Sequence, residues 1–222
     1  MKSELYLSHP DAQFWADFSF VDFSDGYLDS MSESISKALT SMNELEGGAI
    51  ANPDENRMVG HYWLRDAELA PNEELTHAIR ETLAKVKEVA EAVHSGSLQS
   101  PLGDFTDLLV IGIGGSALGP QFVGKALGHP NTNKLRVHFF DNTDPDGLDH
   151  TLSEIGDALS TTLALVISKS GGTPETRNGM LEAENAFTQK GLDFSRHAIA
   201  ITGDGSKLHQ YSQEKGWLDF LP

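Results

Sequence analysis

Short apolar runs alternate with amphipathic segments through the second half of the chain. Each run is bounded by glycine, proline or polar residues, which is typical of strands that are buried on both faces of a parallel sheet. Crossovers between parallel strands are right-handed, so the alternation indicates an α/β fold, a doubly wound sheet with helices on both faces. The pattern predicts strands at residues 107–112, 135–140, 163–167 and 197–202.

The segments between these runs have the length and spacing of helices. The segment "PETRNGMLEAENAFTQKG" places Pro174 at a first helical position and Gly191 just after the last one. Three further helices are expected, in "GPQFVGKALG", "LDHTLSEIG" and "GSKLHQYSQEKG".

The first hundred residues show a different pattern. Apolar residues recur at helical spacing from Leu28 to Met42 and again from Leu75 to Val93, and Asn72 can cap the second of these helices. Between them, "GGAIANPDENRMVGHYWLR" predicts an ordered loop. We therefore expect residues 1–100 to form a helical extension that packs on an α/β domain of residues 101–222, with its methionines and aromatic residues in the core.

The composition is that of an ordinary globular protein, with 39% hydrophobic and 22% charged residues. No apolar run approaches the roughly 20 residues that span a bilayer, and the first residues, "MKSELYLSHP", contain no apolar signal core. The chain also has no cysteine. These features favour a cytoplasmic protein without a membrane partner.

The net charge of −17 narrows the ligands that the protein can take. Such a surface repels the phosphate backbone of nucleic acids, so a nucleic-acid partner is not expected. A small phosphorylated ligand would need a local site made from hydroxyls, backbone N–H groups and helix N-termini.

Two loops have the composition of such a site. The loops "GIGGSALGP" (residues 112–120) and "SKSGGT" (residues 168–173) each follow a predicted strand and precede a predicted helix. Their glycines allow a close approach of the backbone to a phosphate, and their hydroxyls can donate hydrogen bonds. In an open parallel sheet, ligands bind beyond the carboxyl ends of the strands, where the winding reverses. The two loops together predict a phosphate site at that edge.

Other interpretations of the loops remain open at this point. Gly112, Gly114 and Ala117 fit a dinucleotide fingerprint, with Asp141 placed to bind the ribose, but this leaves the second loop unexplained. The hydroxyls could instead cap helices while the glycines only turn the chain. A nucleophile elbow is excluded because Leu118 stands where glycine is required, and the chain has no P-loop motif.

The segments "VIGIGGSALGP", "DNTDPDG" and "ISKSGGTPETRN" together resemble the glucose-6-phosphate isomerase family, and "RMVGHYWLR" is similar to it as well. The resemblance implies a sugar-isomerase (SIS) domain, the first of two in the family, and a cytoplasmic homo-oligomeric enzyme of glycolysis and gluconeogenesis that takes a sugar phosphate and needs no cofactor. It also implies a cradle for the 6-phosphate of the sugar, made by Gly115, Ser116, Ser168, Lys169, Ser170, Gly171, Gly172 and Thr173.

The resemblance assigns no catalytic residue to this chain. It implies that the base and its partners come from later segments and from a second SIS domain, whereas "KGWLDFLP" ends near the point where the first of those motifs would begin. Glu175 is expected to interact with a helix dipole, and His138 and His197 are expected to be structural. The histidines are scattered, so no metal site is expected. A non-catalytic sugar-phosphate-binding module remains the alternative.

Overall fold

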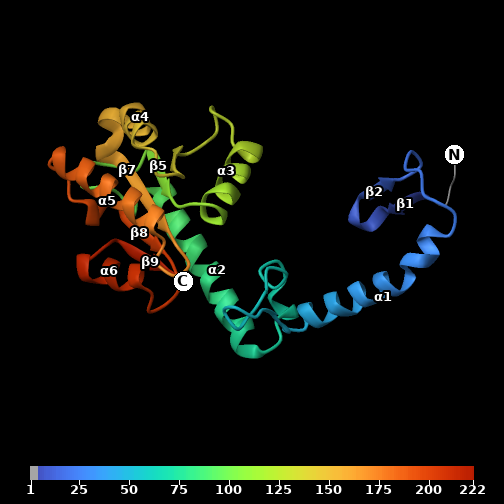
Figure 1. Ribbon diagram of the computed structural model, residues 1–222. Helices are drawn as coiled ribbons and strands as arrows, with labels where there is room; N and C mark the ends of the chain where they lie inside the picture. Colours follow the sequence, from blue (N-terminus) through green and yellow to red (C-terminus); the bar gives the residue numbers. More distant parts are fainter. Residues whose placement is uncertain (1–4) are drawn as a thin grey trace. The chain divides into compact units, whose positions relative to one another are not determined.

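A computed structural model describes residues 5–222, which fall into two compact units that divide between Ile79 and Arg80 (Figure 1). The first unit contains two antiparallel hairpins and one long helix. Its elements are β1 (Tyr6–His9), β2 (Phe14–Asp17), α1 (Tyr27–Glu46), β3 (Ile50–Asn52), β4 (Arg57–Met58) and the start of α2 (Glu73–Ser95). No helix of the described chain is long and apolar enough to cross a membrane.

Both long N-terminal helices form where the apolar spacing predicts them, and Asn72 Oδ1 accepts a hydrogen bond from Leu75 N at 2.9 Å. The two hairpins were not expected, because the segment that holds β3 and β4 was predicted to be a loop. The expectation that the aromatic residues and methionines of this region are core is wrong for most of them: Trp15 is 55% exposed and Phe20 98%. Two-stranded hairpins are too small to enclose an apolar face, and among residues 5–79 only Trp63 is buried.

The second unit is built on a five-stranded parallel sheet with the strand order β6-β5-β7-β8-β9. The four predicted strands are confirmed, and the fifth was not predicted because its three residues are too few to show a period. The strands are β5 (Asp107–Ile111), β6 (Arg136–Phe140), β7 (Thr162–Ile167), β8 (Ala198–Ile201) and β9 (Asp219–Leu221).

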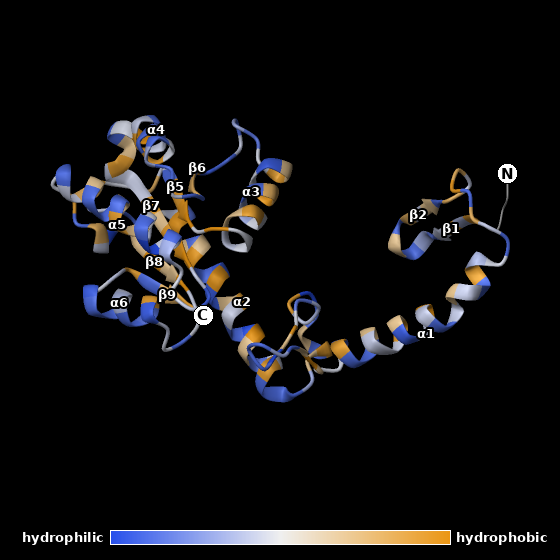
Figure 2. Cartoon of the chain, in the orientation of Figure 1, coloured by the Kyte–Doolittle hydropathy of each residue, from blue (hydrophilic) through white to orange (hydrophobic). Residues whose placement is uncertain are grey.

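Helices cover both faces of this sheet, as the alternation of segments predicts. Apolar side chains of α4, α5 and α6 form the larger core with β5, β7 and β8, and the last turns of α2 close the opposite face. Figure 2 shows apolar residues in the strands and, alternating with hydrophilic ones, along the helices. The four helices that follow strands are α3 (Gly115–Leu127), α4 (Pro145–Ile155), α5 (Pro174–Gln189) and α6 (Lys207–Lys215).

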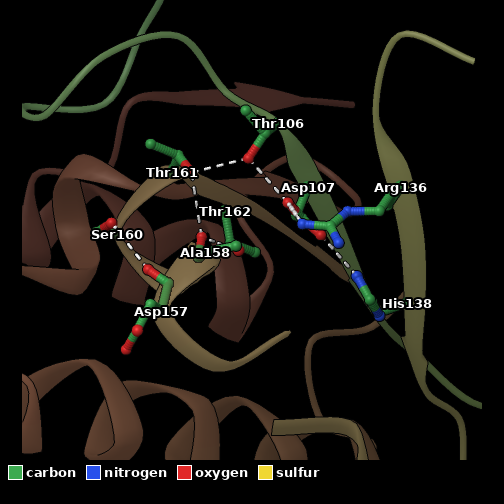
Figure 3. Close-up of polar contacts among 9 residues, drawn as sticks. All are labelled: Thr106, Asp107, Arg136, His138, Asp157, Ala158, Ser160, Thr161 and Thr162. Carbon is green, nitrogen blue, oxygen red and sulfur yellow. Dashed lines mark hydrogen bonds and ion pairs between the residues drawn. The ribbon is translucent and has the colours of Figure 1, made fainter. Parts of the chain in front are cut away.

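A buried carboxylate anchors the amino end of β5 (Figure 3). Asp107 is fully buried and accepts hydrogen bonds from His138 Nε2 at 2.8 Å, Arg136 Nη2 at 3.0 Å and Thr106 Oγ1 at 2.8 Å. Burial alone raises the pKa of Asp107, but these hydrogen bonds and the charge of Arg136 outweigh it and hold the pKa below its ordinary value. His138 therefore has the structural role expected of it.

His197 is also structural. Its ring is buried against Phe105 and Phe187, and Nδ1 lies 3.0 Å from the carbonyl oxygen of Thr162. Burial lowers the pKa of His197, mainly because the charged ring would lose its hydration. The neutral ring can donate from Nδ1 while the buried Nε2 has no partner within the described chain.

We expect Asp107→Asn to lower the free energy of unfolding at pH 7 by about 2–3 kcal/mol, because charge-assisted hydrogen bonds to a buried group are lost. The pKa of Asp107 is lowered in the folded protein, so its contribution is complete above the unfolded value of about 3.9 and disappears as the pH falls below it. Urea unfolding between pH 3 and pH 7 should show the difference between parent and variant shrinking below about pH 4.

The control is Asp157→Asn, which removes an exposed carboxylate from the same unit. This variant should differ little from the parent at any pH. A difference for Asp107→Asn that stays constant across the whole pH range would contradict the interpretation.

Candidate functional site

The strand order places the carboxyl ends of β5 and β7 side by side. If the five strands are numbered along the chain from β5 as 1 to β9 as 5, their order across the sheet is 2-1-3-4-5. The direction of winding therefore reverses between β5 and β7, which is where open α/β sheets bind ligands. The loops that leave these two ends are the two glycine-rich loops. The first loop begins against the end of β7, because a Cβ atom on Gly112 would lie 3.2 Å from the carbonyl oxygen of Ile167. The same Cβ atom would lie 2.8 Å from Cβ of Ser116, so the first loop is also tightly packed on itself.

Two hydroxyls of the second loop face each other. Ser168 is buried, its Oγ accepts a hydrogen bond from Gly171 N at 3.1 Å, and it lies 3.2 Å from Oγ1 of Thr173. Thr173 stands at the N-cap position of α5, yet its side chain makes no capping hydrogen bond. Helix capping therefore does not account for this hydroxyl.

Residues that follow β8 and the first residues of α6 hold the second loop in place. Thr202 Oγ1 donates to the carbonyl oxygen of Ser168 at 2.5 Å, and Gly203 N donates to that of Lys169 at 3.1 Å. Gly171 has a φ of +66° and packs so closely on α6 that a Cβ atom would lie 2.3 Å from Leu208 N. The sequence requires glycine here both for the backbone conformation and for the space.

A cavity of about 400 Å³ opens between this loop, α5 and α6. Four predicted site residues line it: Ser168, Gly171, Gly172 and Thr173. The other four predicted residues, Gly115, Ser116, Lys169 and Ser170, do not line it. The remaining lining residues come from β7, α5 and α6 and are Val166, Thr176, Arg177, Met180, Leu181, Lys207, Leu208 and Tyr211.

The sequence analysis missed two cations in this lining. Arg177 lies one helical turn after Thr173, so its spacing could have revealed it. Lys207 follows Ser206, whose hydroxyl caps α6 by accepting from His209 N. Its place beside the loop depends on how α6 packs, which no local pattern shows.

The first loop is shorter than predicted, because α3 begins at Gly115 rather than at Gly119. Ser116 lies in the first turn of that helix, and its hydroxyl makes no hydrogen bond within the described residues. Asp141, the acid that a dinucleotide site would use, accepts a hydrogen bond from Gln121 Nε2 at 2.6 Å. That carboxylate is therefore engaged with its own chain.

The lining of the cavity carries positive charge and, in the described chain, no carboxylate. Tyr211 donates its hydroxyl proton to Glu184 Oε2 at 2.8 Å. Burial and then Glu184 raise the pKa of Tyr211 to about 12, so the phenol stays neutral. The helix N-termini of α5 and α6 add further positive potential.

The fold is thus a doubly wound α/β domain, and its cavity beside the second loop is lined by hydroxyls and two cations. A family model described as phosphoglucose isomerase matches residues 22–218. The chain belongs to the phosphoglucose isomerase family.

Several glucose-6-phosphate isomerases are similar to this chain in sequence or in structure. The glucose-6-phosphate isomerase of Synechococcus elongatus is 56% identical over 214 residues, which are 96% of this chain and 40% of that protein. That of Geobacter sp. strain M21 is 56% identical over 93% of this chain and 39% of its own length. The crystal structure of a glucose-6-phosphate isomerase from Chlamydia trachomatis matches with a TM-score of 0.81 and 26% identity, covering 99% of this chain and 42% of that one. The chain spans about 40% of the length of these curated relatives.

We expect Gly171→Ala to lower the free energy of unfolding by roughly 2–4 kcal/mol, since a methyl group adds both left-handed strain and a clash with Leu208. Gly216→Ala is the matched control: Gly216 has the same φ of +66° but nothing within 4 Å of the added Cβ. That control should cost only about 1 kcal/mol. Urea unfolding of both variants measures the difference, and equal losses would show that the loop is not packed tightly on α6.

Proposed function

We propose that this chain forms the sugar-phosphate-binding part of an aldose–ketose isomerase that interconverts glucose 6-phosphate and fructose 6-phosphate. The observation that carries the proposal is the hydroxyl pair of Ser168 and Thr173, which lines a carboxylate-free cavity at the N-terminus of α5. The relatives described above are glucose-6-phosphate isomerases, which supports the same activity and substrate for this chain.

In this proposal the cavity holds the 6-phosphate of the sugar. The hydroxyls of Ser168 and Thr173 donate to phosphate oxygens, and Gly171 and Gly172 let the ligand approach the backbone. The remaining proposed contacts, which complete the cradle from outside the cavity lining, are Gly115, Ser116, Lys169 and Ser170. Such contacts bind substrate and transition state about equally, so they position the sugar without moving its protons.

The chemical step needs a base between C1 and C2, a group that opens the sugar ring and a donor for the developing oxyanion. We assign none of these to the described chain, since no carboxylate lines the cavity there. We place them in the longer protein, together with its second SIS domain and its assembly as a homo-oligomer in the cytoplasm.

We predict that this chain alone does not isomerise glucose 6-phosphate. A coupled assay that detects fructose 6-phosphate should give no signal above background with the purified chain, because phosphate contacts without a base do not lower the barrier. Turnover that disappears on mutation of a residue within 1–222 would contradict the prediction.

The two hydroxyls should be needed for tight binding. Ser168→Ala and Thr173→Ala should each weaken binding of glucose 6-phosphate by about 1–3 kcal/mol, on the order of ten- to a hundredfold, because a phosphate oxygen loses its donor. Lys169→Ala should matter less, since Lys169 does not line the cavity. Isothermal titration calorimetry compares the three variants.

Ser195→Ala serves as the control, because it removes a hydroxyl from the same unit outside the cavity. If the Ser168 and Thr173 variants bind like this control, the two hydroxyls do not hold the phosphate and the proposed function fails.

A further inference from the structure

The charge balance of the cavity differs from that of the rest of the chain. Acidic residues outnumber Lys and Arg by 33 to 16. Four other cavities of the described chain each include at least one carboxylate, such as Glu182 or Asp219. The cavity beside the second loop has none, and it includes both Arg177 and Lys207.

In the part of the chain that the structure describes, Arg177 and Lys207 have no ion-pair partner, whereas Lys85, Lys190, Lys215 and Arg136 each pair with a carboxylate. Both side chains are exposed to solvent at the mouth of the cavity. Their guanidinium and ammonium groups are therefore available to a ligand.

Lys207 also stands at a position that opposes helix stability. It is the first residue of α6, where the helix dipole is positive, and no acidic residue in the first turn offsets its charge. By contrast, α2, α4 and α5 each carry an acidic residue in their first turn. A cation at the positive end of a helix is unfavourable unless an anion binds beside it.

We propose that Arg177 and Lys207 form a cation pair that selects the charged phosphate of the ligand and attracts it to the hydroxyls of Ser168 and Thr173. This inference rests on the proposed function, and it names Arg177 and Lys207 as the residues that make the site specific for a charged ligand. The neutral donors of the loop fix the geometry of the phosphate, and the two cations supply the charge that an otherwise anionic surface lacks. Arg177 can form two parallel hydrogen bonds to phosphate oxygens, whereas Lys207 acts as a point charge.

The test is a calorimetric titration of the full chain with glucose 6-phosphate at 50 mM and 200 mM NaCl. Arg177→Gln and Lys207→Gln should each weaken binding roughly three- to tenfold at the lower salt concentration, as expected for solvent-exposed cations facing a dianion. The double variant should weaken it further, and its affinity should depend less on salt than that of the parent, because fewer charges are screened. Arg177 is exposed, so Arg177→Gln should unfold at the same temperature as the parent. Lys207→Gln should unfold at the same or a slightly higher temperature, because it removes an unfavourable charge from the N-terminus of α6.

Lys134→Gln is the matched control, since it removes the same charge from an exposed position outside the cavity. Its affinity should stay within about twofold of the parent, which separates a local effect from the change in net charge. If Arg177→Gln and Lys207→Gln bind like Lys134→Gln, the cation pair does not act on the ligand and the inference is overturned.

Ser168→Ala separates this inference from the proposed function. Weaker binding by Ser168→Ala together with parent-like binding by both cation variants leaves the cradle in place and rejects only the cation pair. Weaker binding by the cation variants with parent-like binding by Ser168→Ala and Thr173→Ala supports the cation pair and rejects the hydroxyl cradle. A parent chain that does not bind glucose 6-phosphate at all overturns both.

Discussion

The parallel pairing of β5 with β7 is the constraint on which the rest of the second unit depends. Between these strands the chain makes β6 and two helices, yet the register runs without a break from Asp107 opposite Thr162 to Ile111 opposite Val166. Leu109, Ile111, Ala164 and Val166 have no solvent exposure and pack in the core on one face of the sheet. Leu163 is buried in the core on the other face, so burial on both faces fixes this register. It follows that the two glycine-rich loops leave neighbouring strands at the same edge of the sheet, where Gly112 lies against the end of β7.

The amino end of β5 anchors the sheet, and its carboxyl end leads to the first glycine-rich loop. At the amino end, Asp107 is buried, charged and fully hydrogen-bonded, and it ties β5 to Arg136 and His138 of β6. At the carboxyl end, Gly112 leads into the loop beside the switch point. The unfavourable burial of a charge thus lies at the opposite end of the sheet from the cavity, so this anchor places no carboxylate at the proposed phosphate site.

The sequence predicts the sheet well because its strands are buried on both faces. A continuous apolar run such as "LALVI", bounded by polar residues and too short for a helix of ordinary length, strongly favours a central strand, whereas β9 is only three residues long and begins with Asp219. The second loop is recognisable because adjacent glycines beside three hydroxyls are unusual at a strand end. Arg177 follows Thr173 by one helical turn and could have been predicted from that spacing, whereas the place of Lys207 depends on α6 packing on the same face of the sheet as α5.

In the first unit, the spacing of apolar residues predicts the helix but not its burial. The apolar spacing in α1 predicts a helix with an apolar stripe, and the helix is present. The same spacing says nothing about what covers that stripe, and Leu39 is 62% exposed. Helix formation is local, whereas burial depends on partners distant in the chain.

The packing of the second loop has a consequence for the thermodynamics of recognition. Thr202, Gly203 and Leu208 fix the backbone of this loop before any ligand arrives. In the proposed complex, a preformed loop would lose little conformational entropy on binding, so affinity differences between two phosphorylated sugars would reflect their direct contacts and their desolvation. The proposed site would then select a phosphate by its shape and charge, without a change in the conformation of the loop.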